Sequence, residues 1–227
     1  MAGTQITVSC IIPAFNEAAR IGGVLSVALG HPDLAEVIVV DDGSTDATAD
    51  LAAQIGARVI RMKANGGKAA AVFRAAQEAR GTHVLMLDAD LIGLTAGDIS
   101  RLVAPVRRRE CEVTISLRGN SPAIWRAMGV DYISGERVLP IGDLLRAAPI
   151  AGFGLEVWMN RGWRLARRKV CIVSCPGLSS PAKAAKKGLL PGLMADAGML
   201  RDIFRTASLP EVVRQIVFFM RAERQRD

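Results

Sequence analysis

Short apolar runs alternate with helical patterns along the first ninety residues. Runs rich in valine and isoleucine predict buried strands at 6–12, 36–40, 57–62 and 84–87. The segments between them predict helices from Asn16 toward Leu29, from Thr45 to Ile55, and from Gly66-Gly67 through Ala79. Pro13 is expected to end the first strand, and Asn16 to cap the first helix. Strict alternation of this kind predicts an α/β fold with right-handed strand–helix–strand units, a mostly parallel sheet and helices on its faces.

The second half of the chain is less regular. Its patterns predict a helix at 95–109, a strand at 112–116, a binding loop at 118–139, a helix at 155–168 and a strand at 170–174. A segment rich in Ser, Pro, Lys and Gly at 178–192 is expected to be mobile, and helices are expected at 193–207 and 210–224. No internal repeat or clean boundary divides the sequence, so one domain over 1–227 is expected.

Polar side chains follow the predicted strands at their carboxyl ends, where parallel sheets bind ligands. Asp88-Ala89-Asp90 closes a buried run, and carboxylates at such a place need a compensating partner. On an extended backbone, this spacing puts both carboxylates on one side, where they could share a ligand. Oxygen ligands of this kind suit Mg²⁺ or Mn²⁺. The alternative is that the two aspartates only cap the strand and begin a turn.

Two further strand ends carry candidate binding residues. Asp41-Asp42-Gly43-Ser44-Thr45 lies between a strand and a helix, where its carboxylates could accept hydrogen bonds from a base or ribose. Gly43 would permit the tight turn, and Ser44 or Thr45 would cap the helix. Lys68 follows two glycines at a helix start, which suits a phosphate. Neither a P-loop nor a Gly-X-Gly-X-X-Gly fingerprint is present, which argues against a dinucleotide enzyme.

Charge is unevenly distributed along the chain. The net charge is +7, made up of −2 for residues 1–160 (15 basic, 17 acidic) and +9 for residues 161–227 (14 basic, 5 acidic). The basic tail indicates an anionic partner: a phosphate-bearing substrate, a membrane face or nucleic acid. Aromatic residues are sparse at 4% and do not interleave with basic ones, so no nucleic-acid partner is expected. No apolar run approaches the ~18 residues that span a bilayer. Four unpatterned cysteines and the lack of a signal-peptide pattern predict a cytoplasmic protein.

Four motifs stand in register over roughly the first ninety residues: Ile12-Pro13-Ala14-Phe15-Asn16-Glu17, Val39-Val40-Asp41-Asp42-Gly43-Ser44-Thr45-Asp46, Asn65-Gly66-Gly67-Lys68 and Leu87-Asp88-Ala89-Asp90. Together they resemble the motifs of family 2 glycosyltransferases of the GT-A fold. The resemblance implies a mixed, mostly parallel sheet, a nucleoside diphosphate sugar donor, a divalent metal and one displacement at the anomeric carbon, with inversion. It implies a nucleotide-sugar and metal half at 1–92, an acceptor half at 93–190 and amphipathic C-terminal helices at 191–227.

The same resemblance assigns roles to single residues in the donor half. Pro13, Phe15 and Glu17 would line the nucleoside pocket, and Asp42, with Asp41, would contact the base. Lys68 would lie near the base or the diphosphate. Asp88 would contact the ribose or the metal and Asp90 the metal, with Ala89 between the two aspartates.

The acceptor half resembles polyprenyl-phosphate glycosyltransferases, including dolichol-phosphate mannose synthases, through Asp131-Tyr132-Ile133-Ser134-Gly135-Glu136-Arg137. By that resemblance, Arg118 and Arg137 would hold the diphosphate and the acceptor phosphate, as guanidinium groups do bidentately. Glu156 would be a general base or a ligand of an acceptor hydroxyl, and Arg126 is a lesser phosphate candidate. The alternatives are solvated arginines and a glutamate that only caps its helix.

The acceptor and the partners stay open at the level of sequence. A polyprenyl phosphate is expected first, and a small soluble acceptor such as a phosphorylated hydroxy acid is the alternative. A nucleotide-binding module without turnover is the alternative from another class. The last predicted helix carries an apolar stripe that would pack on the core, or on a second copy in a homodimer, or lie on an anionic membrane surface at the inner face. The stripe consists of Leu209, Val212, Val213, Ile216, Val217 and Met220.

Overall fold

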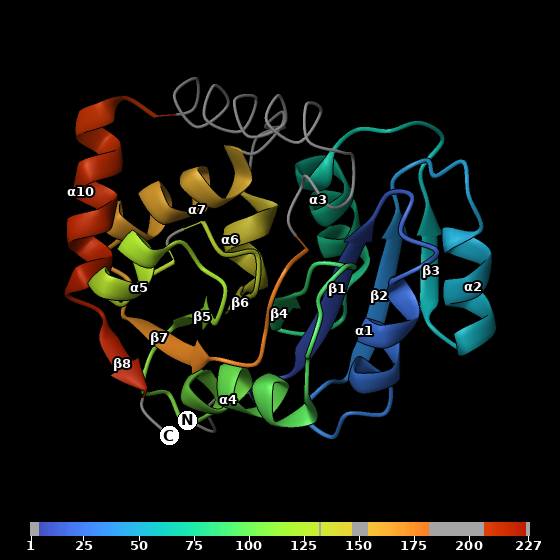
Figure 1. Cartoon of the computed structure of the whole chain (residues 1–227), viewed down its shortest axis with the longest axis horizontal. Helices are drawn as coiled ribbons and strands as arrows, with labels where there is room; N and C mark the ends of the chain where they lie inside the picture. The colour runs from blue at the N-terminus through green and yellow to red at the C-terminus, as the bar shows by residue number, and fades with distance from the viewer. Residues whose placement is uncertain (1–4, 132, 147–153, 182–206, 226–227) are drawn as a thin grey trace.

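The computed structural model describes residues 5–131, 133–146, 154–181 and 207–225, and they contain an eight-stranded sheet (Figure 1). Its spatial order is β3-β2-β1-β4-β6-β5-β7-β8. The strands are β1 (Val8–Ala14), β2 (Glu36–Asp41), β3 (Arg58–Arg61), β4 (His83–Met86), β5 (Val113–Arg118), β6 (Arg137–Pro140), β7 (Val170–Cys175) and β8 (Glu223–Gln225). All neighbours pair in parallel except β6, which is antiparallel to β4 and β5. The expected mixed, mostly parallel sheet is confirmed.

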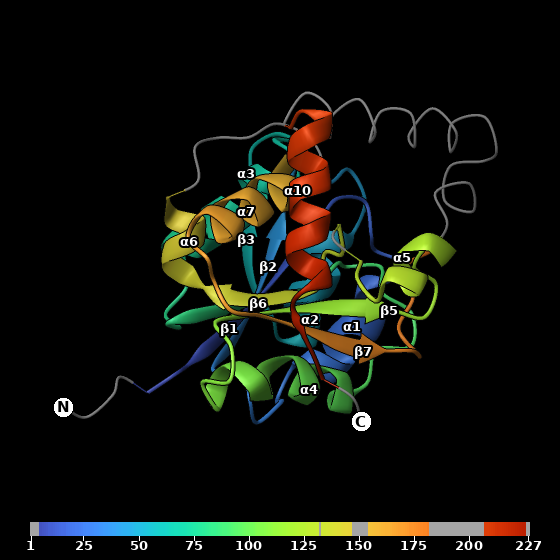
Figure 2. The ribbon, with the colours of Figure 1, turned by 90° about the vertical axis from the view of Figure 1, so that its left-hand side faces the viewer.

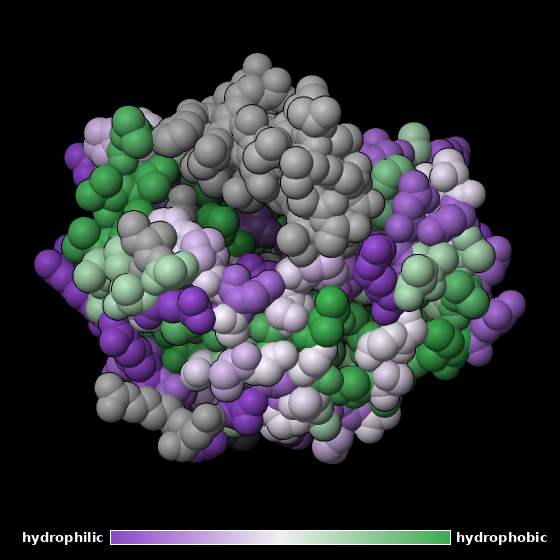
Figure 3. All heavy atoms as spheres, in the orientation of Figure 1, coloured by the Kyte–Doolittle hydropathy of each residue, from purple (hydrophilic) through white to green (hydrophobic). Residues whose placement is uncertain are grey.

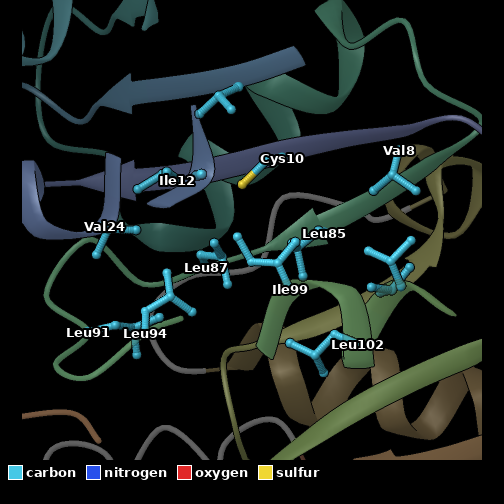
Figure 4. Packing of buried hydrophobic residues seen from close by; sticks show 14 of the residues in the cluster. Val8, Cys10, Ile12, Val24, Leu85, Leu87, Leu91, Leu94, Ile99 and Leu102 are labelled. Carbon is cyan, nitrogen blue, oxygen red and sulfur yellow. The ribbon is translucent and has the colours of Figure 1, made fainter. Parts of the chain in front are cut away.

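Helices cover both faces of the sheet. They are α1 (Ile21–Ala28), α2 (Thr48–Ile55), α3 (Lys68–Glu78), α4 (Ala96–Arg107), α5 (Ala123–Met128), α6 (Ile141–Leu145), α7 (Gly154–Leu165) and α10 (Leu209–Met220). Successive side chains of a strand point to opposite faces. On β1, Cys10 and Ile12 therefore pack with α1, α2 and α4, whereas Ile11 packs with α3, α7 and α10. Figure 4 shows the first of these clusters, with Val24, Ile99 and Leu102 against β1 and β4.

The strand expected to end before Pro13 continues through it to Ala14. The carbonyl of Ile11 accepts the N–H of Leu87, so Ile11 faces β4. Pro13, two residues later, faces the same side, where β4 has already ended, so its missing N–H removes no ladder hydrogen bond.

Two expected helix caps were wrong. Helix α1 begins at Ile21, and Asn16 instead adopts a left-handed conformation with φ of 56°. Its side-chain oxygen accepts the N–H of Thr45 at 2.9 Å, which ties the loop after β1 to the loop after β2. Helix α2 begins at Thr48, so neither Ser44 nor Thr45 caps it. A contact between loops that are 29 residues apart outcompeted the local cap.

The segment expected to be one loop at 118–139 contains helix α5 and most of strand β6. Both elements are too short for a periodic pattern to reveal them. The mobile segment expected at 178–192 and the helix expected at 193–207 lie almost entirely outside the described residues. Among the residues that the structure does describe, no helix is both long and apolar enough to cross a membrane.

Candidate functional site

Three charged side chains from separate elements meet at the carboxyl edge of the sheet. Lys68 opens α3, Asp88 follows β4, and Glu156 lies in the first turn of α7. The Lys68 Nζ lies 2.7 Å from Asp88 Oδ1 and 2.8 Å from Glu156 Oε1. Burial alone would lower the pKa of Lys68, but the carboxylates of Asp88 and Glu156 outweigh it and raise that pKa. The lysine is therefore a fixed cation between two anions. The structure thus brings together three of the residues that the sequence singled out.

Gly135 makes room for this arrangement. A Cβ at this position would lie 2.6 Å from Asp88 Oδ2 and 2.8 Å from Lys68 Nζ. The loop before β6 therefore passes directly against the ion pair, and only glycine fits there without displacing it. Gly135 lies within the stretch that suggested a polyprenyl-phosphate glycosyltransferase, but sequence reasoning gave it no role.

Asp42 positions the start of helix α3. Its two carboxylate oxygens accept the backbone N–H groups of Gly66 and Gly67, each at 2.8 Å. This holds the turn that leads into Lys68. Neighbouring Asp41 accepts the N–H of Ser44 at 3.3 Å. Both aspartates are buried at the end of β2, so the expected base contacts would have to share oxygens that already accept hydrogen bonds from the backbone.

The residues expected to line a nucleoside pocket lie at the end of β1 and in the loop that follows. Pro13 is half-buried within the strand, and Phe15 just after it is 44% exposed. Glu17 pairs with Arg20 at 3.2 Å, and its N–H donates to Thr48 Oγ1 at 2.8 Å. The loops after β1 and β2 are thus joined, and Phe15 presents an open aromatic surface at this edge.

Arg118 ends β5 and is held by buried acids. Its guanidinium lies 3.2 Å from Asp131, 3.6 Å from Glu136 and 2.6 Å from Ser180 Oγ. Burial would lower its pKa, but Glu136 and Asp131 raise it. Among the residues that the structure describes, three buried atoms of this group find no hydrogen-bond partner: Arg118 Nε, Asp131 Oδ1 and Glu136 Oε1. Sequence reasoning missed Asp131 and Glu136 as partners of Arg118, although both stand in the quoted motif.

The structure does not place Arg137 as an open phosphate ligand. Its side chain is fully buried, and its guanidinium donates to the carbonyl of Ser134 at 2.9 Å and to Asn160 Oδ1 at 3.0 Å. It also lies over the Trp163 ring at 5.4 Å. Arg137 begins β6 opposite Met86 and Ile115, and its contacts with Asn160 and Trp163 place the side chain on the face of the sheet that α7 covers. Its expected role as a phosphate ligand stays a prediction, and these contacts are those of a side chain that supports the site.

Asp90 follows a different backbone path from the one expected. Strand β4 ends at Met86, and Ala89 and Asp90 lie in a turn, so the extended-strand argument for two carboxylates on one side does not apply. Asp90 is half-buried, whereas Ala89 is buried. The lesser candidate, Arg126, is exposed on α5 and donates to the carbonyl of Gly119 at 3.2 Å.

Two carboxylates that follow β4 are candidate metal ligands. Within the described ranges, no group of three or more His, Cys, Asp or Glu side chains could hold an ion. Asp88 and Asp90 follow β4 as hard oxygen ligands, and Mg²⁺ is commonly bound by one or two carboxylates together with substrate phosphates. The residues thus fit a metal whose other ligands come from a diphosphate or water.

The sheet order, with one antiparallel strand inside a mostly parallel sheet, agrees with the expected GT-A fold. The chain belongs to glycosyl transferase family 2, whose family model matches residues 9–174. It is 31% identical to the dodecaprenyl-phosphate galacturonate synthase of Rhizobium johnstonii over 51% of this chain and 37% of that protein. It is 34% identical to the glucosyl-3-phosphoglycerate synthase of Mycolicibacterium paratuberculosis over 97% of this chain and 66% of that protein. The chain thus spans less than two thirds of either relative.

A solved structure agrees in fold. Glucosyl-3-phosphoglycerate synthase from Mycobacterium tuberculosis, in complex with Mn²⁺, uridine diphosphate and glucosyl-3-phosphoglycerate, superposes with a TM-score of 0.73 at 23% identity. The match covers 90% of this chain and 81% of that one. The expected family and fold are confirmed.

Proposed function

We propose that this protein transfers a hexose from a nucleoside diphosphate sugar to a phosphate-bearing acceptor. The observation that carries this proposal is the Lys68, Asp88 and Glu156 constellation, which lies at the carboxyl edge of the sheet. The solved relative that shares this fold binds uridine diphosphate and Mn²⁺. The phosphate-bearing acceptor is supported by the names of both relatives, which are a dodecaprenyl-phosphate and a phosphoglycerate synthase.

The donor would bind across the ends of β1, β2 and β4. Phe15 offers an apolar surface to the nucleoside, and Asp42 holds the turn that aims Lys68 at the site. Asp88 and Asp90 would hold Mg²⁺ or Mn²⁺, which when bound stabilises the negative charge of the leaving diphosphate. Three cations, Lys68, Arg118 and Arg137, face four carboxylates, Asp88, Asp131, Glu136 and Glu156, in one electrostatic cluster. The cluster thus has a formal net charge of −1, which favours binding of a diphosphate together with a metal ion over binding of a metal-free diphosphate.

Transfer would proceed by one displacement. An acceptor oxygen forms a bond to the anomeric carbon while the bond from that carbon to the diphosphate breaks, so the configuration inverts. A phosphate nucleophile is already an anion and needs no base. A hydroxyl nucleophile must lose a proton, and we propose that Glu156, the carboxylate paired with Lys68, accepts it.

We infer a polyprenyl phosphate as the first acceptor, because the Asp131–Arg137 stretch resembles that subgroup. The second candidate is a small phosphorylated hydroxy acid, supported by the similarity to a phosphoglycerate synthase over 97% of this chain. The two acceptors separate in a transfer assay with labelled donor, undecaprenyl phosphate and 3-phosphoglycerate. Glu156→Gln should lower kcat by about 10²–10⁴-fold if the nucleophile is a hydroxyl, and much less if it is a phosphate.

The donor half is tested by thermal shift with UDP-, GDP- and dTDP-sugars, each with and without Mn²⁺. A metal-dependent rise in Tm with one nucleotide is expected, because a ligand of the folded state stabilises it by mass action. Asp90→Asn should remove the metal dependence, whereas the control Asp50→Asn, an exposed pair with Arg61, should not. Nucleotide binding without transfer or donor hydrolysis would instead identify a binding module without turnover.

A further inference from the structure

Helix α10 buries two polar residues among its inward side chains and leaves a stripe of apolar residues exposed to solvent. Glu211, Gln215 and Phe219 are its buried residues, and Glu211 pairs with Arg164 of α7 at 2.7 Å. The outer side carries an apolar stripe with exposures of 63%, 56%, 42% and 47% for Leu209, Val213, Val217 and Met220. A surface helix ordinarily shows the reverse pattern. Of the stripe expected from sequence, only Val212 and Ile216 pack against the core. The outer stripe therefore needs a partner.

A basic groove runs along this stripe. Between α10, the end of α7 and the start of β7 lies a cavity of about 570 Å³, into which Val213 and Val217 project. Its charged lining comprises Arg164, Arg168, Lys169, Arg214 and Arg221 against Glu223. Arg214 and Arg221 form no ion pair with any residue that the structure describes, and they lie two helical turns apart beside Val217. Figure 2 shows α10 beside α7 on this side, and Figure 3 shows hydrophobic side chains gathered over α10.

We propose that the outer face of α10, with the α7–α10 groove, docks onto an anionic lipid bilayer. A helix of 12 residues is about 18 Å long and can lie in the plane of the interface with Val213 and Val217 in the acyl boundary. Arginines at the edge of such a stripe place their stems along apolar surface and their charges among lipid phosphates. A second copy of this chain suits the surface less well, because a two-fold contact would oppose Arg214 and Arg221 to like charges.

The docked face also has a defined relation to the candidate site. Glu156 stands in the first turn of α7 and Arg164 in its last, so the two are about 12 Å apart along the helix. The bilayer would thus meet the end of α7 that is remote from the constellation of Lys68, Asp88 and Glu156. Docking is independent of which acceptor the enzyme uses.

The test is co-sedimentation of the full chain with vesicles of phosphatidylglycerol and phosphatidylcholine, compared with phosphatidylcholine alone, and without polyprenyl phosphate. Wild-type protein should bind the anionic vesicles and release at high salt. Val213→Asp/Val217→Asp and Arg214→Glu/Arg221→Glu should each weaken binding at least about tenfold. The matched control is Ile55→Asp/Arg61→Glu on α2 and β3, where Ile55 is 43% exposed, and it should bind like the wild type.

Thermal melts of each variant establish that it is folded. Failure of wild-type protein to bind anionic vesicles would overturn the proposal, as would unchanged binding by both α10 variants. A concentration-dependent dimer that Val217→Asp abolishes, without vesicle binding, would assign the surface to a second copy instead. Because these vesicles contain no acceptor, none of these outcomes bears on glycosyl transfer.

Discussion

At the scale of single residues, the candidate site depends on side chains that hold other side chains. Asp42 fixes the turn before Lys68, and Asp131 and Glu136 hold Arg118. Gly135 contributes only the space that its missing Cβ leaves. These supporting residues are buried or closely packed, so their substitution can change both activity and stability. Measuring both quantities separates the two effects.

Gly135→Ala should impair catalysis more than stability. The new methyl group would collide with the carboxylate of Asp88 and the amine of Lys68, which are the ends of flexible side chains that can move aside. We expect a loss of donor affinity or kcat of at least about tenfold, because small displacements of positioned groups are costly in catalysis. Calorimetry with donor and Mn²⁺, steady-state kinetics and a thermal melt measure the two effects. Gly162→Ala on α7, where a Cβ meets nothing within 4 Å, is the control. Equal activity of the two variants would show that the ion pair tolerates displacement.

Arg137→Met should reduce the free energy of unfolding by about 3–5 kcal/mol, since removing one partner of a buried ionic network leaves its acids uncompensated. Burial lowers the pKa of this arginine, and Glu156 and Glu136 oppose that shift. Urea unfolding measures the loss. Arg74→Met removes an exposed pair with Glu78 and should cost less than about 1 kcal/mol. If Arg137→Met were as stable as the wild type but raised the KM for the acceptor, Arg137 would be a phosphate ligand after all.

At the scale of elements, the loops between strands and helices act as one unit. Gly43 after β2 has φ of 73°, and its backbone lies against Ala64 and Asn65 in the loop before α3. Asn16 joins the loop after β1 to the same region through Thr45. The candidate site is therefore assembled from contacts between loops rather than from any one motif.

The variants Gly43→Ala and Gly30→Ala test the contact between the loop after β2 and the loop before α3. They form a matched pair because both glycines have φ of 73°. A Cβ on Gly30 meets nothing within 4 Å, whereas on Gly43 it would lie 2.8 Å from the backbone of Ala64 and Asn65. Gly30→Ala should cost only the backbone strain of about 1–2 kcal/mol. Gly43→Ala should cost more and should also weaken donor binding. Urea unfolding and thermal shift with donor measure both, and equal costs would refute the loop contact.

The elements also show what sequence could predict. Regular alternation of buried strands and helices identified the first four strands and α2 and α3, because each has a periodic apolar pattern. It failed for β6, which is four residues long and enters the sheet between β4 and β5 in the opposite direction. The pairing of Asp42 with Gly66 and Gly67 spans 24 and 25 residues and leaves no local signal. The expected roles of Phe15, Asp88 and Asp90 in donor binding stay predictions.

At the scale of the whole molecule, polar residues gather at both ends of the strands, and the two groups have different functions. Ligand-directed residues gather at the carboxyl ends of the strands. Near the amino ends, Glu36 accepts hydrogen bonds from Ser9 Oγ at 2.8 Å and the N–H of Arg80 at 2.6 Å, and pairs with Arg58 at 3.3 Å. One carboxylate therefore joins β1, β2, β3 and the segment after α3, on the side of the sheet away from the candidate site.

This edge should make stability depend on pH. Burial raises the pKa of Glu36, but hydrogen bonds from Arg80 and Ser9 and the charge of Arg58 lower it by more. The pKa of Glu36 in the folded protein therefore lies below its usual value. The unfolded pKa is about 4.3. A depressed folded pKa contributes stability that is fully present above the unfolded pKa and is lost as pH falls through the folded pKa.

Glu36→Gln should therefore lower the free energy of unfolding at pH 7 by about 1–2 kcal/mol, since glutamine keeps neutral hydrogen bonds but loses the charge-assisted ones. The difference from wild type should shrink below about pH 4, where the unfolded wild-type chain takes up the proton first. Urea unfolding at several pH values between 7 and 3 measures both free energies. Asp50→Asn, which removes a 66% exposed carboxylate, should stay within about 1 kcal/mol of the wild type at pH 7. A deficit for Glu36→Gln that persists unchanged at the lowest pH would mean that packing, rather than the charge of Glu36, joins the strands at this edge.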